Sequence, residues 1–247
     1  MDEINSIKTT LLSDVEITGS LTFKGKLSFE GKLKEGSIAG ENLFVGKGAD
    51  IQGDIKADSL RWTDLPIKDA ELAGAIDALS LPAVEGYATE INLRARHWMG
   101  EVGRALNRGY VLTIDYGYPA SLYYAPFRFS GTLTAFVRHH SIDDVLAEPG
   151  MRDITAHVDF TALARAGEHA GLATLGFLDQ QHFLMGVAHE ELSGAGGPQV
   201  KIQENLRAWN TLTHPNHLGA DFFALLQAKD APANLDGLRF ARPGGLE

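Results

Sequence analysis

A glycine recurs every six residues near the amino terminus, at Gly19, Gly25 and Gly31. The apolar residues around these glycines come in alternating pairs, Val15/Ile17, Leu21/Phe23 and Leu27/Phe29. Side chains two residues apart on a strand share a face, and a glycine lets the backbone turn without a Cβ clash. The pattern therefore predicts a β-solenoid (β-helix), whose short strands stack coil on coil and bury a continuous apolar stripe.

The amino-acid composition changes near residue 60. Residues 1–60 contain seven lysines and no arginine, whereas the rest of the chain has twelve arginines, three lysines and all nine histidines. So abrupt a change predicts two units of different origin, a β-helix fragment over 1–60 and a second unit over 61–247. The junction is expected near residues 57–66.

Helical and strand patterns alternate in the second unit. One helix is predicted around 91–106, with Trp98 and Met99 on its apolar face, and a buried strand follows at 111–114. Further strands are predicted within GTLTAFVRHH (131–140) and at ATLGFL (173–178). Further helices are predicted at FTALARAGEHAGL, capped by Thr161, and at QQHFLMGVA, with Phe183 in the core. This order predicts an α/β fold with helices on the sheet faces, a flexible linker at 193–199 and a flexible tail at 241–247.

The net charge of −10 argues against binding to nucleic acid or to anionic lipid and favours a basic partner. The chain has no cysteine, which removes disulfides and thiolate metal sites. The sequence contains no run of 18 apolar residues, so no membrane span is predicted. We expect a cytoplasmic location.

Asp115 and Tyr116 directly follow the predicted strand at 111–114. In doubly wound α/β sheets, ligands bind at the carboxyl ends of the strands. The two residues therefore have two interpretations: they orient a substrate guanidinium or the cofactor edge, or they form a strand-end turn with Tyr116 packed against a helix. The second is favoured for this chain.

Two other patterns suggest sites that we reject. LFVGKGADIQGD has the G-x-G spacing of a phosphate loop, but an extended pattern follows it where such a loop needs a helix. Arg138, His139 and His140 lie beside Asp143 and Asp144, but neighbouring histidines on a strand point to opposite faces and no third ligand is evident. No metal site is therefore expected.

The first unit resembles a known family. LLSDVEITGSLTFKGKLSFEGKL and VGKGADIQGDIKADSL, over about residues 8–60, are similar to the start of bactofilins, bacterial cytoskeletal proteins whose β-helix polymerises end to end. This resemblance implies self-association through the β-helix.

The second unit resembles another family over about residues 62–230. GYATEI (86–91), IDYGYP (114–119), GTLTAFVRHH, DITAHVDFTAL (153–163) and QQHFL (180–184) are similar to the carboxy-terminal part of MidA-like class I methyltransferases of the complex I assembly type. The resemblance implies a partial Rossmann-like fold, S-adenosylmethionine (SAM) as cofactor, and a protein substrate with an exposed arginine. Carboxylates suit such a substrate because they bind a guanidinium in a bidentate way.

The resemblance also implies roles for individual residues. Asp115, Tyr116 and Glu90 match catalytic positions, although Glu90 equally suits a backbone amide or the first turn of a helix. The substrate-binding positions are matched by Arg138, His139, His157 and Asp159. A satisfied buried histidine is the default interpretation of His157.

The glycine-rich cofactor loop of this family does not precede GYATEI here, so cofactor-binding residues are not assigned. Three functions stay open: a SAM-dependent protein-arginine methyltransferase that is inactive alone, a non-catalytic scaffold that polymerises through its β-helix, and a fusion or truncation product that does neither.

Overall fold

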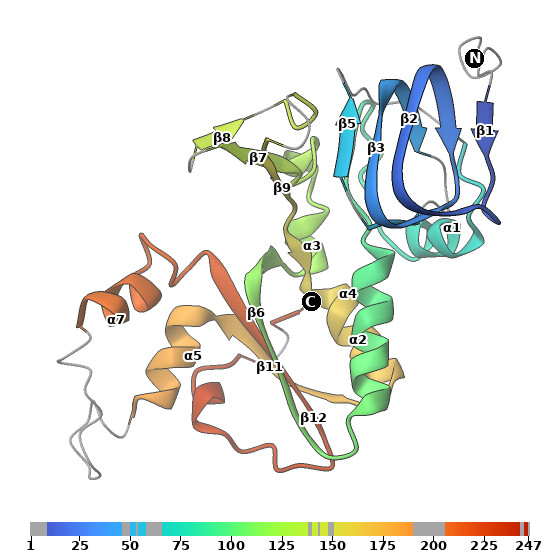
Figure 1. Cartoon of the computed structure of the whole chain (residues 1–247). Helices are drawn as coiled ribbons and strands as arrows, with labels where there is room; N and C mark the ends of the chain where they lie inside the picture. Colours follow the sequence, from blue (N-terminus) through green and yellow to red (C-terminus); the bar gives the residue numbers. More distant parts are fainter. Residues whose placement is uncertain are drawn as a thin grey trace. The chain divides into compact units, whose positions relative to one another are not determined.

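A computed structural model describes residues 9–45, 50–52, 54–57, 66–137, 140–142, 144–147, 151–189, 206–242 and 245–246. The chain forms two compact units (Figure 1). The first consists of residues 1–66 and 133–155, and the second of residues 67–132 and 156–247. The second unit is thus interrupted by a segment of the first, which the predicted division at residue 60 did not include. The predicted linker at 193–199 lies outside the described residues.

Parallel strands make up the amino-terminal part of the first unit. They are β1 (Thr9–Leu11), β2 (Glu16–Phe29), β3 (Lys32–Val45), β4 (Asp50–Ile51) and β5 (Asp54–Ala57). β2 pairs with β1 and β3, and β3 pairs with both β4 and β5. Phe29, Leu33 and Ile38 are buried between them. The alternation of apolar residues predicted these strands, but β2 and β3 run for 14 residues each instead of breaking at every hexad.

Glycines in these strands have conformations that other residues rarely adopt. Gly19 and Gly25 have φ angles of 103° and 81°, and both lie inside β2. Gly36 has a φ of 126° and faces Gly19 so closely that a Cβ would lie 2.0 Å from the Gly19 carbonyl oxygen. The spacing of glycines therefore marks places where the strands need glycine.

An antiparallel sheet of β7 (Thr134–Val137), β8 (His140–Ile142) and β9 (Asp153–Thr155) completes the first unit. The segment GTLTAFVRHH, predicted to contain one strand, supplies β7 and the first residue of β8. Arg138 and His139 lie outside the described residues.

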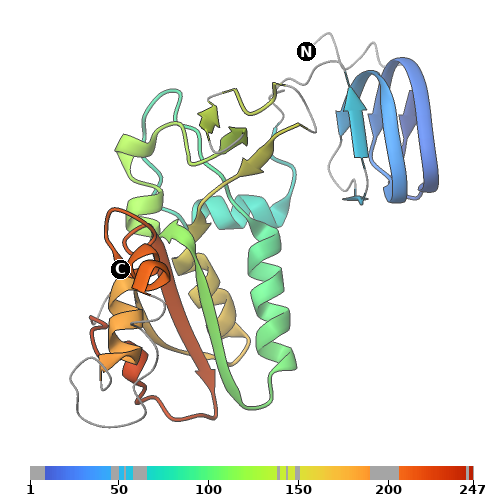
Figure 2. The same cartoon turned by 60° about the vertical axis from the view of Figure 1, so that its left-hand side comes forward.

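The second unit has a four-stranded mixed sheet in the order β10 (Val158–Asp159), β6 (Gly109–Tyr118), β12 (Phe222–Lys229) and β11 (Ala173–Asp179). β10 is parallel to β6, whereas β12 is antiparallel to both of its neighbours. Figure 2 shows β6 and β12 side by side. The strands predicted at 111–114 and 173–178 are confirmed as parts of β6 and β11.

Helices cover both faces of this sheet. Those that pack directly on it include α2 (Leu93–Ala105), α4 (Phe160–His169) and α5 (Gln180–Val187). The others are α1 (Ala70–Asp77), α3 (Ala120–Tyr123), α7 (Leu206–Thr213) and the 3-10 helices η2 (Pro126–Arg128) and η3 (Asp236–Leu238). None of the helices in the described part of the chain is long and apolar enough to cross a bilayer.

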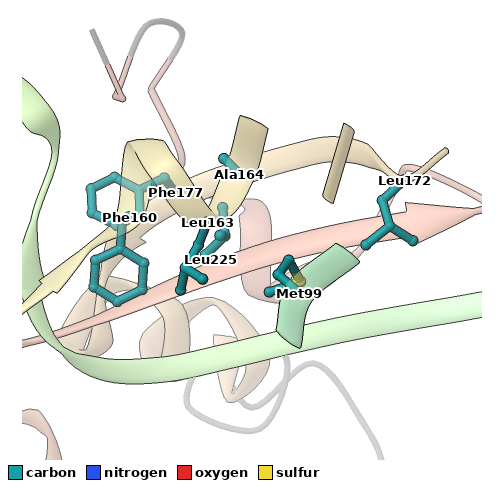
Figure 3. Close-up of a cluster of buried hydrophobic side chains, with 7 residues drawn as sticks. All are labelled: Met99, Phe160, Leu163, Ala164, Leu172, Phe177 and Leu225. Carbon is teal, nitrogen blue, oxygen red and sulfur yellow. The ribbon is translucent and has the colours of Figure 1, made fainter. Parts of the chain in front are cut away.

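The core of the second unit forms where α2 and α4 pack on the sheet (Figure 3). Met99 from α2, Phe160 and Leu163 from α4 and Leu225 from β12 are buried there. Ala224, the neighbour of Leu225, belongs instead to a cluster with Phe183 of α5. Successive residues of a strand point to opposite faces, so α5 covers the face opposite α2 and α4.

Two predictions for this unit differ from the structure. Trp98 is 52% exposed and not a core residue, because the buried face of α2 consists of Met99, Gly100 and Gly103. Thr161 does not cap α4; the Asp159 carboxylate accepts the Ala162 N–H at 2.9 Å and is the cap. Thr161 Oγ1 instead donates to the Leu246 carbonyl at 3.0 Å, within the segment predicted as a tail.

Candidate functional site

The carboxyl ends of β6 and β10 lie side by side because the two strands are parallel at Gly117 and Tyr118. A Cβ on Gly117 would lie 2.2 Å from the Val158 carbonyl oxygen, so this approach requires glycine. The pairing brings His157 to the end of β6, where its ring meets the edge of Tyr116 with centroids 5.2 Å apart. Two segments about 40 residues apart in sequence are thus brought together at the strand end that carries Asp115 and Tyr116.

Glu90 connects two segments of this site. Its carboxylate accepts the Thr132 backbone N–H at 3.0 Å and the Thr132 hydroxyl at 3.1 Å, and the Tyr123 hydroxyl lies 3.3 Å away. Gly131 has a φ of 75°, and a Cβ there would collide with Glu90 Oε1. Of the roles considered for Glu90, the structure shows the grip on a backbone amide. The first turn of α2 is capped by Asn92 instead, which accepts the Ala95 N–H at 2.9 Å.

His157 is held by the same network. Its backbone N–H donates to Thr132 Oγ1 at 3.0 Å, and its carbonyl lies 3.2 Å from the Tyr123 hydroxyl. Its ring Nδ1 is buried and has no hydrogen-bond partner among the described residues. Burial, reinforced by the positive charge of Arg128, lowers the pKa of His157 below its usual 6.5. The imidazole is therefore neutral at pH 7.

Four side chains at this end form a ladder. The His157 ring touches Tyr116 on one side and stacks on Tyr118 on the other, with the centroids of His157 and Tyr118 5.0 Å apart and the rings 15° from parallel. The Arg128 guanidinium lies on Tyr118, with Cζ 3.7 Å from the ring centroid. We call Tyr116, His157, Tyr118 and Arg128 the aromatic ladder. The Tyr118 ring thus already binds one planar cation, the guanidinium of Arg128.

Asp159 does not face the ladder with a free carboxylate. One oxygen caps α4 and the other accepts the hydroxyl of the buried Tyr124 at 2.8 Å. Burial is the main cause that raises the pKa of both Tyr123 and Tyr124, and the nearby carboxylates add to it. Both phenols therefore stay protonated and act as hydrogen-bond donors.

Asp115 keeps part of its carboxylate available. Its Oδ1 accepts the Tyr116 N–H at 2.8 Å, and it is close enough to influence the pKa of His157. Tyr116 also packs edge-on against Phe222 of β12, with centroids 5.6 Å apart. Tyr116 thus packs at the strand end, but against strand β12 and not against the helix that was predicted. The functional role of Asp115 and Tyr116 stays a prediction.

Sequence reasoning missed Tyr118, Tyr123, Tyr124, Arg128 and Thr132. Tyr118 lies within the quoted motif IDYGYP, two residues from Tyr116, and strand alternation would have placed it on the same side as Tyr116. The partners of the other four lie up to 42 residues away along the chain, so no local pattern marks them. Within the described ranges, no three His, Asp or Glu side chains come together in a metal-binding group.

Comparisons with known proteins bear on this site. A family model described as "Putative S-adenosyl-L-methionine-dependent methyltransferase" matches residues 31–178. The mitochondrial protein arginine methyltransferase NDUFAF7 of Rattus norvegicus is 34% identical over 125 residues, which are 48% of this chain and 26% of that protein. Its Homo sapiens counterpart is 32% identical over 148 residues, 56% of this chain and 30% of that protein. The chain thus spans about a quarter to a third of the length of these curated relatives.

Two solved proteins of one superfamily from Burkholderia thailandensis are similar in structure. An uncharacterized protein aligns with a TM-score of 0.65 at 30% identity, over 75% of this chain and 50% of that one. A second, bound to S-adenosyl-homocysteine, aligns with a TM-score of 0.64 at 30% identity, over 75% of this chain and 48% of that one. None of the matches described above is to a bactofilin. The family model covers more than half of the residues, and the chain therefore belongs to this family of S-adenosyl-L-methionine-dependent methyltransferases.

Proposed function

We propose that the chain takes part in SAM-dependent methylation of arginine in a protein substrate, and that its second unit supplies the substrate side of the site. The observation that carries this proposal is the aromatic ladder beside Asp115 at the carboxyl end of β6. Ring faces attract a guanidinium and a carboxylate binds its fork, so this set of groups matches an arginine side chain. The relatives named as protein arginine methyltransferases support the same substrate class.

The described residues do not fit the cofactor itself. SAM carries a ribose diol and a methionine carboxylate, which need free hydrogen-bonding groups. At this site, Glu90 is engaged by Thr132 and Tyr123, and Asp159 by the helix cap and Tyr124. No strand in the described ranges leads through a glycine-rich loop into a helix, the arrangement expected beside the nucleoside part of the cofactor. We infer that this chain alone does not hold SAM and is inactive without a further cofactor-binding part.

Arginine binding tests the proposal. We expect a short peptide with a central arginine to shift the NMR signals of Tyr118 and His157, and the same peptide with lysine to bind more weakly because lysine lacks the planar fork. Asp115→Asn should weaken arginine-peptide binding about tenfold, the cost of losing one charge-assisted hydrogen bond. Asp236→Asn, on the distant η3, is the matched control. Equal binding of both peptides, or no effect of Asp115→Asn, would rule the proposal out.

We propose as a second candidate that the first unit is a self-associating scaffold, with its parallel strands wound as solenoid coils of the bactofilin type. The observation that favours it is an open strand edge. β1 pairs only with Leu27–Phe29 of β2, so residues 16–23 of β2 have a strand partner on one side alone among the described residues. An open edge is a template for pairing with another chain. The cysteine-free composition supports the cytoplasmic location that we also propose.

Light scattering over a concentration series, with negative-stain microscopy, tests the scaffold. Growth of the mean mass with concentration, together with filaments on the grid, is expected if the β2 edge is used. A monomer at every concentration would contradict this second candidate and leave arginine binding untouched.

A further inference from the structure

Arg128 is held rigidly at the end of the aromatic ladder. Its guanidinium carbon lies 3.7 Å from the Tyr118 ring centroid and 5.3 Å from that of Phe127. Its Nε donates to the Leu122 carbonyl at 3.0 Å. One face and one edge of the guanidinium are therefore fixed by contacts within η2, α3 and β6.

The other edge of this guanidinium is unused. Among the residues that the structure describes, Nη1 and Nη2 of Arg128 have no hydrogen-bond or ion-pair partner, and the side chain is half-buried. These two nitrogens present parallel N–H donors, the geometry that matches the two oxygens of a carboxylate. A fork already held by Tyr118 and Leu122 loses little side-chain entropy when it binds such a group.

Apolar side chains are exposed around this fork. Leu122, whose carbonyl holds Arg128, is 45% exposed, and Phe127, whose ring contacts Arg128, is 70% exposed. Phe129, the next residue, is 53% exposed. Exposed large apolar side chains mark an interaction site, and here they belong to residues that contact a positively charged side chain or follow it in the chain. We call Leu122, Phe127, Arg128 and Phe129 the η2 surface.

We propose that the η2 surface binds a partner protein through an acidic peptide segment, with an Asp or Glu carboxylate on Nη1 and Nη2 of Arg128 and flanking apolar side chains on Leu122 and Phe127. Charge complementarity selects this partner, because the positively charged Nη1 and Nη2 donors of Arg128 bind an anion. The exposed phenylalanines call for apolar neighbours of that anion. This inference shares Arg128 with the aromatic ladder but needs neither the cofactor nor Asp115, so its peptide test can fail while the arginine-binding test succeeds.

A competing explanation makes the opposite prediction. If Arg128 instead occupied the place of a substrate arginine on Tyr118, its removal would uncover the ring and strengthen the binding of an arginine peptide. An acidic peptide would then gain nothing from Arg128.

The test uses two labelled peptides on the full chain, acetyl-Gly-Leu-Glu-Phe-Gly-amide and the same peptide with Gln in place of Glu. The net charge of −10 works against unspecific binding of the Glu peptide, so a preference for it reports a local site. We expect fluorescence anisotropy to show about tenfold tighter binding of the Glu peptide, the usual worth of one charge-assisted pair. Equal binding of the two peptides would overturn the proposal.

Variants locate the site. Arg128→Lys keeps the charge and loses the fork, so the preference for the Glu peptide should fall to less than threefold, whereas Arg94→Ala, an exposed arginine on α2, should keep it. Phe127→Ser should weaken both peptides together. If Arg128→Lys keeps the full preference, or if Arg128→Ala strengthens an arginine peptide and leaves the Glu peptide unchanged, the proposal is wrong. Because Arg128→Lys preserves the charge, the conclusion does not depend on whether Arg128→Ala folds.

Discussion

The carboxylate of Glu90 accepts the hydrogen bond of the Thr132 backbone N–H, which would otherwise need a carbonyl of a neighbouring strand or helix. Thr132 is only 7% exposed. Glu90→Ala leaves the Thr132 N–H and hydroxyl buried with fewer acceptors. An unsatisfied buried group costs about 1–3 kcal/mol, and we expect the free energy of unfolding to fall by about that amount. Urea denaturation measures it.

Glu85→Ala is the control for this change, because Glu85 is exposed in the same loop and surface substitutions alter stability by less than about 0.5 kcal/mol. If Glu90→Ala were as mild as Glu85→Ala, the structural role given to Glu90 would be wrong.

His157 provides a pH test. Its folded-state pKa lies below the unfolded value of 6.5, so the unfolded chain binds a proton that the folded chain does not. Its contribution to stability is therefore complete above pH 6.5 and declines as the pH falls from 6.5 toward the folded-state pKa. An NMR titration of the His157 ring should give a midpoint below 6.5. A midpoint at or above 6.5 would contradict the buried, neutral imidazole.

Single residues were predictable only where a motif or a strand end marked them. Asp115 and Tyr116 follow a run of apolar strand residues, and Glu90 was found through the family resemblance alone. Arg128 and Tyr124 were not predictable, because the groups that fix them come from β6 and from the start of α4. Their roles depend on tertiary contacts that leave no local periodicity.

At the scale of the element, Asp159 joins β10 to α4. Asp159→Ala removes the helix cap, worth about 1 kcal/mol, and also leaves the buried Tyr124 hydroxyl without its acceptor. Asn92→Ala removes only a cap, that of α2. Thermal or urea unfolding should therefore show a larger loss for Asp159→Ala than for Asn92→Ala.

Tyr124→Phe separates the two contributions of Asp159. When it is combined with Asp159→Ala, the further loss should be smaller than the sum of the single changes, because the hydroxyl that needs an acceptor is gone. Strict additivity would show that the Tyr124–Asp159 hydrogen bond does not contribute.

Elements were predicted better than their ends. The 3.6-residue spacing located α2, and the run of apolar residues located β6, because both patterns are local. The cap of α4 was misplaced by two residues, since Asp159 and Thr161 are both good capping residues and only the backbone geometry distinguishes them. Trp98 was misassigned because an aromatic residue beside a buried methionine fits the helical pattern whether or not it is covered.

At the scale of the whole molecule, the change of amino-acid composition predicted that two units exist. It did not predict that residues 133–155 cluster with the first of them, because contacts between distant segments leave no compositional trace. The family could be recognised from the second unit, where five short motifs agree. The chain covers about half of the two solved relatives. Its own residues could not predict this share, because it depends on the length of the relatives.

The claim on which this account rests is that the aromatic ladder and Asp115 can bind an arginine while the chain alone cannot hold the cofactor. Isothermal titration calorimetry with S-adenosyl-homocysteine tests it most directly, with the S-adenosyl-homocysteine-binding Burkholderia thailandensis protein as the positive control. The account predicts no saturable heat up to about 1 mM ligand for this chain, which corresponds to a binding free energy weaker than about −4 kcal/mol. Micromolar binding with one site per chain would contradict it.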